Sequence, residues 1–357
     1  MKTGLLKITF PFFFSFIVSV AVDTPAQSSG GNFTGLFFQP DAVENDRSGY
    51  VALKLTPQAS FSGYLLLAGK RLPFASSFES VSSSTEVSIP RAGTTPLTVV
   101  LSLANEDSLQ GYVTDGSWTV PLTAERLVWD KKSAPASDHA GQYTTSIDKS
   151  TDVAKPNGYG YGTVTVDGGG TVKLIGALGD GTKVTQITTV SKTGLWPLYV
   201  SSYGGKGSAL GWIPLNNDTN AIAPVVWTKE SVVGPLYPDG FKISTRLFCS
   251  PYHPPTPGNR VMQVSEGYVV LEGGPLTATF VNELSLSPQN KVTNLGDYKL
   301  SMRFVPKTGL FIGTINEPGT GTKLKFSGIV FQTDDLAVGT FIARSRSGSV
   351  VIAGDEP

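Results

Sequence analysis

The sequence predicts an all-β protein made of tandem antiparallel β-meander or barrel-like modules, with Gly-rich hairpins and little helix. Apolar and polar residues alternate with period two, as at residues 50–55, 163–166 and 299–304. Turn residues interrupt these runs at short intervals, and the 357-residue chain holds 40 Gly and 24 Pro. No long 3.6-residue period with helix caps occurs, so short turns rather than helices are expected to join the strands.

The composition excludes several classes of protein. The chain carries 28 Lys and Arg against 28 Asp and Glu, so its formal net charge is zero. A nucleic-acid-binding domain normally carries a basic excess, and none is present, so no nucleic-acid partner is expected. The hydrophobic fraction of 40% is too high for a disordered polymer.

The N-terminal residues predict export. Lys2 and Lys7 flank a short basic start, residues 8–22 are mostly apolar, and small residues follow at Ala21 and Ala26. This order predicts a cleavable signal peptide over residues 1–26, with a retained anchor as the alternative. The mature chain is then secreted, periplasmic or at the cell surface.

An integral membrane protein is not expected. The remaining apolar runs have the length of strands and are too short for a membrane-spanning helix. The last residues, 354–357, do not form the terminal aromatic strand of an outer-membrane barrel.

A hairpin signature repeats along the chain. In each copy, a strand contains an apolar residue, then any residue, then a glycine. Such a glycine marks a bend, a bulge or a close approach of two backbones, so its expected role is structural. The four copies contain Gly63, Gly111, Gly176 and Gly313.

A larger repeat pairs two tryptophan motifs, Trp118 with Trp129 and Trp212 with Trp227. Recurrence at matching positions predicts packing roles for Trp118, Trp129 and Trp227. The expected modules are residues 31–131, 141–230 and 231–354. Residues 132–140 form a linker between the first two. The third module is either separate or one larger domain with the second.

Several segments resemble a known family. They are Gly31 to Phe37, Asp180 to Gln186 (DGTKVTQ), Gly194 to Trp212 (GLWPLYVSSYGGKGSALGW), Lys291 to Leu295, Thr308 to Gly313 and Phe326 to Gln332. Across residues 31–352 the chain resembles a Gly-rich β-module family that bacteria secrete or display at the cell surface. The resemblance implies export and a multi-module β fold. That family has no assigned activity, so the resemblance implies no catalytic residue.

The sequence contains few signatures of catalysis. Whether the protein is an enzyme stays open, and a non-catalytic protein is favoured. The histidines, His139 and His253, fall in the linker and in a Pro-rich loop, and no motif for zinc, phosphate or a serine nucleophile occurs. We therefore expect no catalytic residue, metal or cofactor. The single cysteine, Cys249, is expected to be a partly buried small hydrophobic residue. A pair of carboxylates that hydrolyses glycosides stays open as an alternative, because the distance between the two groups in the folded protein decides whether they can act together.

The leading hypothesis is an exported non-catalytic β protein with a structural, surface or interaction role. The alternative is a carbohydrate-binding or polysaccharide-processing protein that uses the aromatic-rich segment at residues 194–212. Its candidate ligand-binding residues are Trp196, Tyr199, Tyr203 and Trp212, of which Trp196 is expected to be the most exposed. The partners would be an extracellular polysaccharide or other surface proteins.

Overall fold

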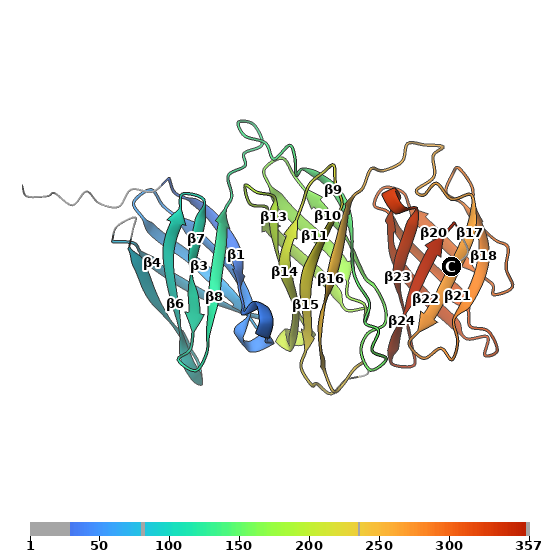
Figure 1. Cartoon of the computed structure of the whole chain (residues 1–357), viewed down its shortest axis with the longest axis horizontal. Coiled ribbons are helices and arrows are strands. Elements are labelled where there is room, and N and C mark those ends of the chain that lie inside the picture. Colours follow the sequence, from blue (N-terminus) through green and yellow to red (C-terminus); the bar gives the residue numbers. More distant parts are fainter. Residues whose placement is uncertain (1–28, 80–82, 235, 355–357) are drawn as a thin grey trace, which may run out of the picture.

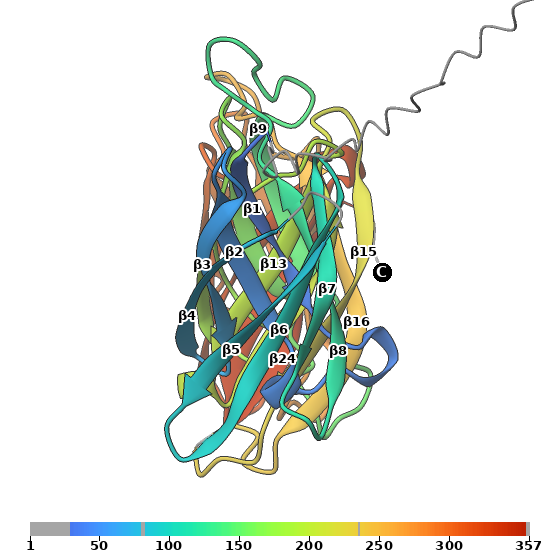
Figure 2. The ribbon, with the colours of Figure 1, turned by 90° about the vertical axis from the view of Figure 1, so that its left-hand side faces the viewer.

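Three antiparallel barrels stand side by side and make a rod (Figure 1). The computed structural model describes residues 29–79, 83–234 and 236–354. The predicted signal peptide lies outside these residues. Viewed along the rod, the three barrels superimpose (Figure 2). Their interiors are formed by separate apolar clusters, one per barrel.

The barrels have eight strands each. Barrel 1 consists of β1 (Gly31–Phe37), β2 (Gly49–Leu55), β3 (Ser60–Leu67), β4 (Lys70–Ser77), β5 (Ser84–Arg91), β6 (Thr94–Asn105), β7 (Ser108–Thr114) and β8 (Thr119–Arg126). Barrel 2 consists of β9 (Gly141–Ile147), β10 (Gly160–Val166), β11 (Thr171–Ala177), β12 (Lys183–Thr189), β13 (Leu195–Ser202), β14 (Gly207–Pro214), β15 (Ala221–Lys229) and β16 (Phe241–Pro251). Barrel 3 consists of β17 (Glu266–Gly273), β18 (Phe280–Leu286), β19 (Val292–Asn294), β20 (Ser301–Val305), β21 (Leu310–Asn316), β22 (Lys323–Phe331), β23 (Leu336–Ala343) and β24 (Arg346–Ala353). Helix is confined to single 3-10 turns: η1 (Pro40–Ala42), η2 (Asn45–Arg47), η3 (Tyr203–Gly205) and η4 (Gln332–Asp334).

Each barrel pairs its first strand with its eighth and leaves one seam, between the fourth and fifth strands in barrels 1 and 2 and between the third and fourth strands, β19 and β20, in barrel 3. Side chains bridge the seam of barrel 2. The Trp196 indole Nε1 donates to Gln186 Oε1 at 2.9 Å, and Gln186 Nε2 donates to the Pro197 carbonyl at 2.8 Å. Eight strands leave an interior that side chains fill, so each barrel is a packed core. The predicted all-β class with tandem barrel-like modules and little helix is confirmed.

The second sheet extends further than the expected module at residues 141–230. Strand β16 pairs with β15 on one side and with β9 on the other, so it completes barrel 2. The expected division after residue 230 therefore cuts through this sheet. The cause is the tryptophan repeat, since Trp129 follows the eighth strand of barrel 1, whereas Trp227 lies in the seventh strand of barrel 2. Every strand of a meander has the same alternation, so a short motif matches several strands equally well.

The expected linker is packed rather than free. Ala136 is fully buried and His139 is 9% exposed. The Trp129 ring lies 5.4 Å from the His139 ring in an edge-on contact, and its indole donates to the Ser191 carbonyl at 3.1 Å. The segment between β8 and β9 therefore lies against barrel 2.

Over the described residues, no helix has the length and apolar character needed to cross a membrane.

Gly176 of β11 faces Gly162 of β10 in a close approach of two strands. A Cβ built at Gly176 overlaps the Tyr161 carbonyl oxygen and lies 2.8 Å from the Gly162 Cα. We expect Gly176→Ala to lower the free energy of unfolding by about 1–3 kcal/mol, because the two strands must separate. The matched control is Gly168→Ala in the turn of the same hairpin, where a Cβ would lie 4.0 Å from its nearest neighbour, Lys131 Cγ.

Denaturant unfolding of the two variants measures this difference. The control is expected to change the free energy of unfolding by no more than about 0.5 kcal/mol. Equal stability of the two variants would show that Gly176 imposes no constraint on the hairpin.

Candidate functional site

The aromatic segment at residues 194–212 is mostly buried. Trp196 is 0% exposed inside barrel 2, so the expectation that it is the most exposed of the candidate residues is wrong. Tyr199 is 3% exposed and lies between barrels 1 and 2, and Trp212 packs at its edge. The strands alternate as expected, but both of their faces are covered, one by the interior of barrel 2 and the other by barrel 1.

Tyr203 lies at one end of barrel 2, in a buried polar cluster. Its hydroxyl donates to Asp180 Oδ2 at 2.7 Å and accepts from the Trp227 indole at 3.1 Å. Burial raises the pKa of Tyr203, and the Asp180 carboxylate raises it further. Lys229 Nζ lies 5.3 Å from the centre of the Tyr203 ring and donates to the Tyr237 carbonyl at 2.7 Å. These groups satisfy one another and close the end of the barrel.

The four candidate residues therefore do not meet around one groove. Trp196 belongs to the barrel interior, Tyr199 and Trp212 to the junction of barrels 1 and 2, and Tyr203 to the barrel end. Trp196 and Tyr199 are buried, and Trp212 and Tyr203 are partly buried, so the four rings do not form one exposed platform on which a sugar could stack.

The junction of barrels 1 and 2 has an apolar core with polar contacts around it. Leu36 and Tyr50 of barrel 1 pack with Tyr199 and Leu210 of barrel 2, and each is at most 4% exposed. The Tyr50 hydroxyl lies 2.9 Å from Thr188 Oγ1 in a hydrogen bond. Apolar side chains of the two barrel walls thus pack against one another across the junction.

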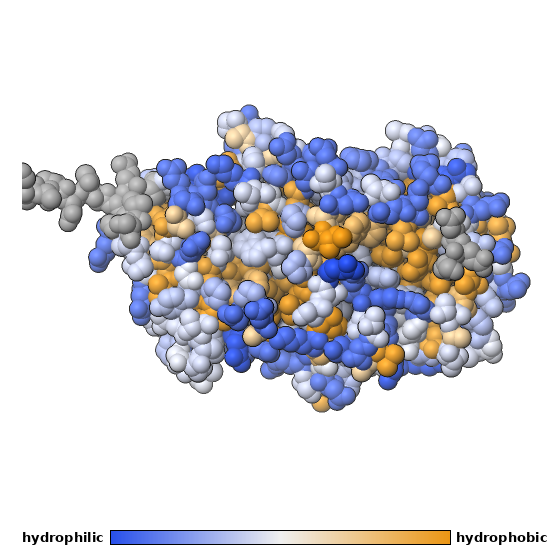
Figure 3. Space-filling view, viewed as in Figure 1, coloured by the Kyte–Doolittle hydropathy of each residue, from blue (hydrophilic) through white to orange (hydrophobic). Residues whose placement is uncertain are grey.

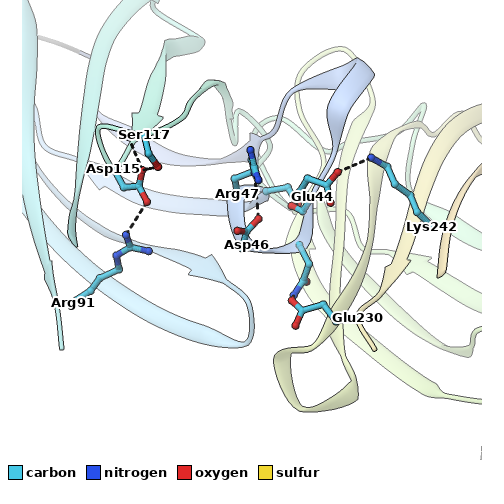
Figure 4. A network of polar contacts seen from close by, with 10 residues as sticks. Glu44, Asp46, Arg47, Arg91, Asp115, Ser117, Glu230 and Lys242 are labelled. Carbon is cyan, nitrogen blue, oxygen red and sulfur yellow. Dashed lines mark hydrogen bonds and ion pairs between the residues drawn. The ribbon is translucent and has the colours of Figure 1, made fainter. Parts of the chain in front are cut away.

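Charged residues surround a hollow of about 640 Å³ at the edge of this junction (Figure 4). Its acids are paired: Glu44 with Lys242 at 3.1 Å, and Glu230 with Lys206 at 3.1 Å. Asn45, 4% exposed, donates to Glu230 Oε1 at 2.8 Å, and this hydrogen bond is the main reason that the pKa of Glu230 is lowered. Each of these two carboxylates therefore has a cationic partner at the edge of the hollow.

Two larger hollows lie on the outer walls, each above a signature glycine. Strands β1 to β4 form one of about 750 Å³ around Gly63, and strands β20 to β22 form one of about 680 Å³ around Gly313. Lys54 and Arg71 line the first. No carboxylate lines either hollow. The sequence showed the glycines and the cations, but only the strand order brings them together.

The two histidines and the cysteine make contacts within the fold. His139 Nδ1 is hydrogen-bonded to the Leu215 carbonyl at 2.8 Å. The main chain of His253 bonds to the Gln332 side chain in an exposed loop. Cys249 is 2% exposed in the core of barrel 2, where burial raises the pKa of its thiol to about 12. Within the described part of the chain, no group of three or more His, Cys, Asp or Glu residues is arranged to hold a metal ion.

Known proteins show only a weak similarity to this chain. No family model matches the chain, and no curated protein matches it in sequence. Among solved structures, it is similar to a double mutant of the vaccine antigen transferrin binding protein B from Haemophilus parasuis. The identity is 9%, the TM-score is 0.23, and the match covers 92% of this chain and 77% of that chain. A likeness this weak says nothing about what this chain binds, and the resemblance to a secreted Gly-rich family remains a prediction.

Burial of Cys249 has a measurable consequence. The folded chain keeps a thiol proton that the unfolded chain releases near its ordinary pKa of about 8.5. The resulting contribution to the free energy of unfolding is complete below pH about 8.5 and falls as the pH rises toward 12. We expect native protein at pH about 8 to resist alkylation by iodoacetamide, and denatured protein to take up one label per chain.

The matched variant is Cys249→Ala. Its free energy of unfolding is expected to fall less steeply with rising pH than that of the unchanged protein, because the titrating thiol is gone. Alkylation of the native chain at the rate of a free thiol would contradict a buried Cys249.

Proposed function

We propose that this protein is an exported, non-catalytic rod that presents the outer walls of its three barrels to macromolecular partners at or beyond the cell surface. The observation that carries this proposal is the burial of side chains between the barrels. A chain of independent barrels on flexible linkers would leave those walls in water.

The second junction supports the same conclusion. Tyr161 of barrel 2 packs with Ile329 and Val338 of barrel 3, and the Phe248 and Phe331 rings meet edge-on at 4.7 Å. Lys149 of barrel 2 forms an ion pair with Glu272 of barrel 3. Both junctions thus combine an apolar centre with specific polar contacts, which fixes the angle between neighbouring barrels.

Barrel 2 receives its neighbours on opposite sides. Strands β13 and β14 face barrel 1, and strands β9 and β10 face barrel 3. In the eight-stranded ring of barrel 2, β9 and β10 lie four strands away from β13 and β14, which is the opposite side of the barrel. The three barrels therefore follow one line. On the face shown in Figure 3, hydrophilic residues gather toward the loop ends, and apolar residues lie among them along the middle. A straight rod with mixed walls suits display or spacing better than catalysis.

The carbohydrate alternative at residues 194–212 gains no support, because its four aromatic rings are divided between the interior of barrel 2, the first junction and the end of the barrel.

Export is tested by expressing the whole chain, from Met1, in a bacterium with a secretory pathway. We expect the protein outside the cytoplasm, with residues 1–26 or slightly fewer removed, as read by intact mass spectrometry. The control lacks residues 2–22 and should stay in the cytoplasm. Recovery of the uncleaved whole chain from the cytoplasm would overturn the exported role.

Rigidity is tested by placing a charge in the first junction. Leu36 is 1% exposed and points away from the interior of barrel 1, so Leu36→Asp buries an unpaired carboxylate between two intact barrels. We expect the junction to lose about 3 kcal/mol and barrel 1 to melt in a separate, earlier calorimetric transition. The matched control is Ser88→Asp on the exposed face of β5. Identical melting of the two variants would mean that the junction does not couple the barrels.

A further inference from the structure

Within the described strands, acidic residues occur only in β5, β8, β17 and β18. Strands β1 to β4, β10 to β12 and β20 to β22 contain no Asp or Glu. Their exposed basic residues are Lys54, Lys70, Arg71, Lys173, Lys183, Arg303, Lys323 and Lys325. We call these ten strands the basic wall. These strands carry cations and no acids, although the chain as a whole has zero net charge.

The basic residues of this wall are also unpaired. Among the described residues, none of the eight makes a hydrogen bond or an ion pair. Arg71 and Lys183 only lie over tyrosine rings, at 3.8 Å from Tyr64 and 5.9 Å from Tyr161. In the other strands every basic residue bonds to a partner: Arg91, Arg126, Lys229, Lys242, Arg246 and Arg346. The contrast marks the eight as available to an outside anion.

The wall continues across both junctions. Thr34, in the hollow around Gly63, is hydrogen-bonded to Thr189 at the end of β12, with 2.9 Å between the oxygens. Ser327, in the hollow around Gly313, is hydrogen-bonded to Tyr161 at 2.6 Å, and the Tyr161 ring lies under Lys183 at the start of β12. Strand β12 therefore runs from one hollow toward the other, over roughly 20 Å at the usual rise per residue. A single extended molecule can follow this path.

We propose that the basic wall binds a linear acidic polysaccharide whose carboxylates pair with the unpaired Lys and Arg side chains. The proposal rests on the exported role and names the partner that the rod would meet outside the cytoplasm. The hollows around Gly63 and Gly313 are the anchoring points at either end, each with two cations and several hydroxyl groups. Barrel 2 supplies the middle of the path through Lys173 and Lys183.

The groups between the cations favour a sugar polymer. Rows of hydroxyl side chains such as Thr163, Thr165 and Thr185 lie beside the lysines on β10 to β12 and match the hydroxyls of sugar rings. Ile187 and Ile175 are 71% and 50% exposed and offer apolar contact for ring faces. Nucleic acid is the weaker fit, because its dense phosphates call for a more basic protein than one of zero net charge.

The experiment measures binding of sodium polygalacturonate to the mature chain by calorimetry. We expect binding that weakens as salt is raised and no binding of dextran, which is neutral. The double variant Lys173→Gln with Lys183→Gln should bind about fivefold more weakly, as expected for the loss of two exposed ion pairs. The control, Lys132→Gln with Lys291→Gln, removes two exposed lysines outside the wall and should bind like the unchanged protein.

Several results would overturn the proposal: no binding of polygalacturonate, equal loss in both double variants, or tighter binding of single-stranded DNA or polyglutamate than of polygalacturonate. Circular dichroism checks that the variants stay folded. Failure here leaves export and the coupled melting of the barrels untouched, and failure of those two tests leaves the binding result standing, so the two proposals fail separately.

Discussion

The structure depends on burying both faces of a few strands. In each barrel, alternate side chains fill the interior, which is the ordinary requirement of a closed sheet. At the junctions, the outward side chains of β1, β2, β9, β10, β13, β14, β22 and β23 are covered as well. This second layer of burial joins the three barrels into one rod, and it withdraws the side chains that lie inside the junctions from contact with outside partners. The walls left in water carry whatever recognition the protein has.

Burial of both faces of some strands also explains why the sequence predicts the sheets and turns correctly but not the exposure of the aromatic residues. Alternation and turn chemistry predict the antiparallel sheets, because they reflect local geometry: Asp180 and Gly181 form the expected turn between β11 and β12, with Asp180 Oδ1 accepting from the Thr182 amide. The run from Trp196 to Val200 is different, since a continuous apolar stretch is equally compatible with an exposed aromatic face and with a strand enclosed between two barrels. Only the position of the neighbouring barrel decides, and that position is not a local property.

The basic wall illustrates the same limit. The absence of acids from KVTQITT or LFIGTIN is visible in the printed sequence, yet each strand alone is unremarkable. Strand order and two hydrogen bonds across junctions, Thr34 with Thr189 and Tyr161 with Ser327, assemble these strands into one surface. Trp196 and Gln186 come from two of the segments that carry the family resemblance. Their hydrogen bond joins the two edge strands at the seam of barrel 2, so here these residues help to close the barrel. A sequence motif can thus reflect the packing that a fold requires and need not mark a binding site.

Small-angle X-ray scattering of the mature chain tests the rigid rod most directly. The account predicts a profile that fits three barrels in a fixed straight line, with a distance distribution that ends sharply at the length of the rod. A distribution with a long, smooth tail, fitted only by an ensemble of barrels that move independently, would contradict it.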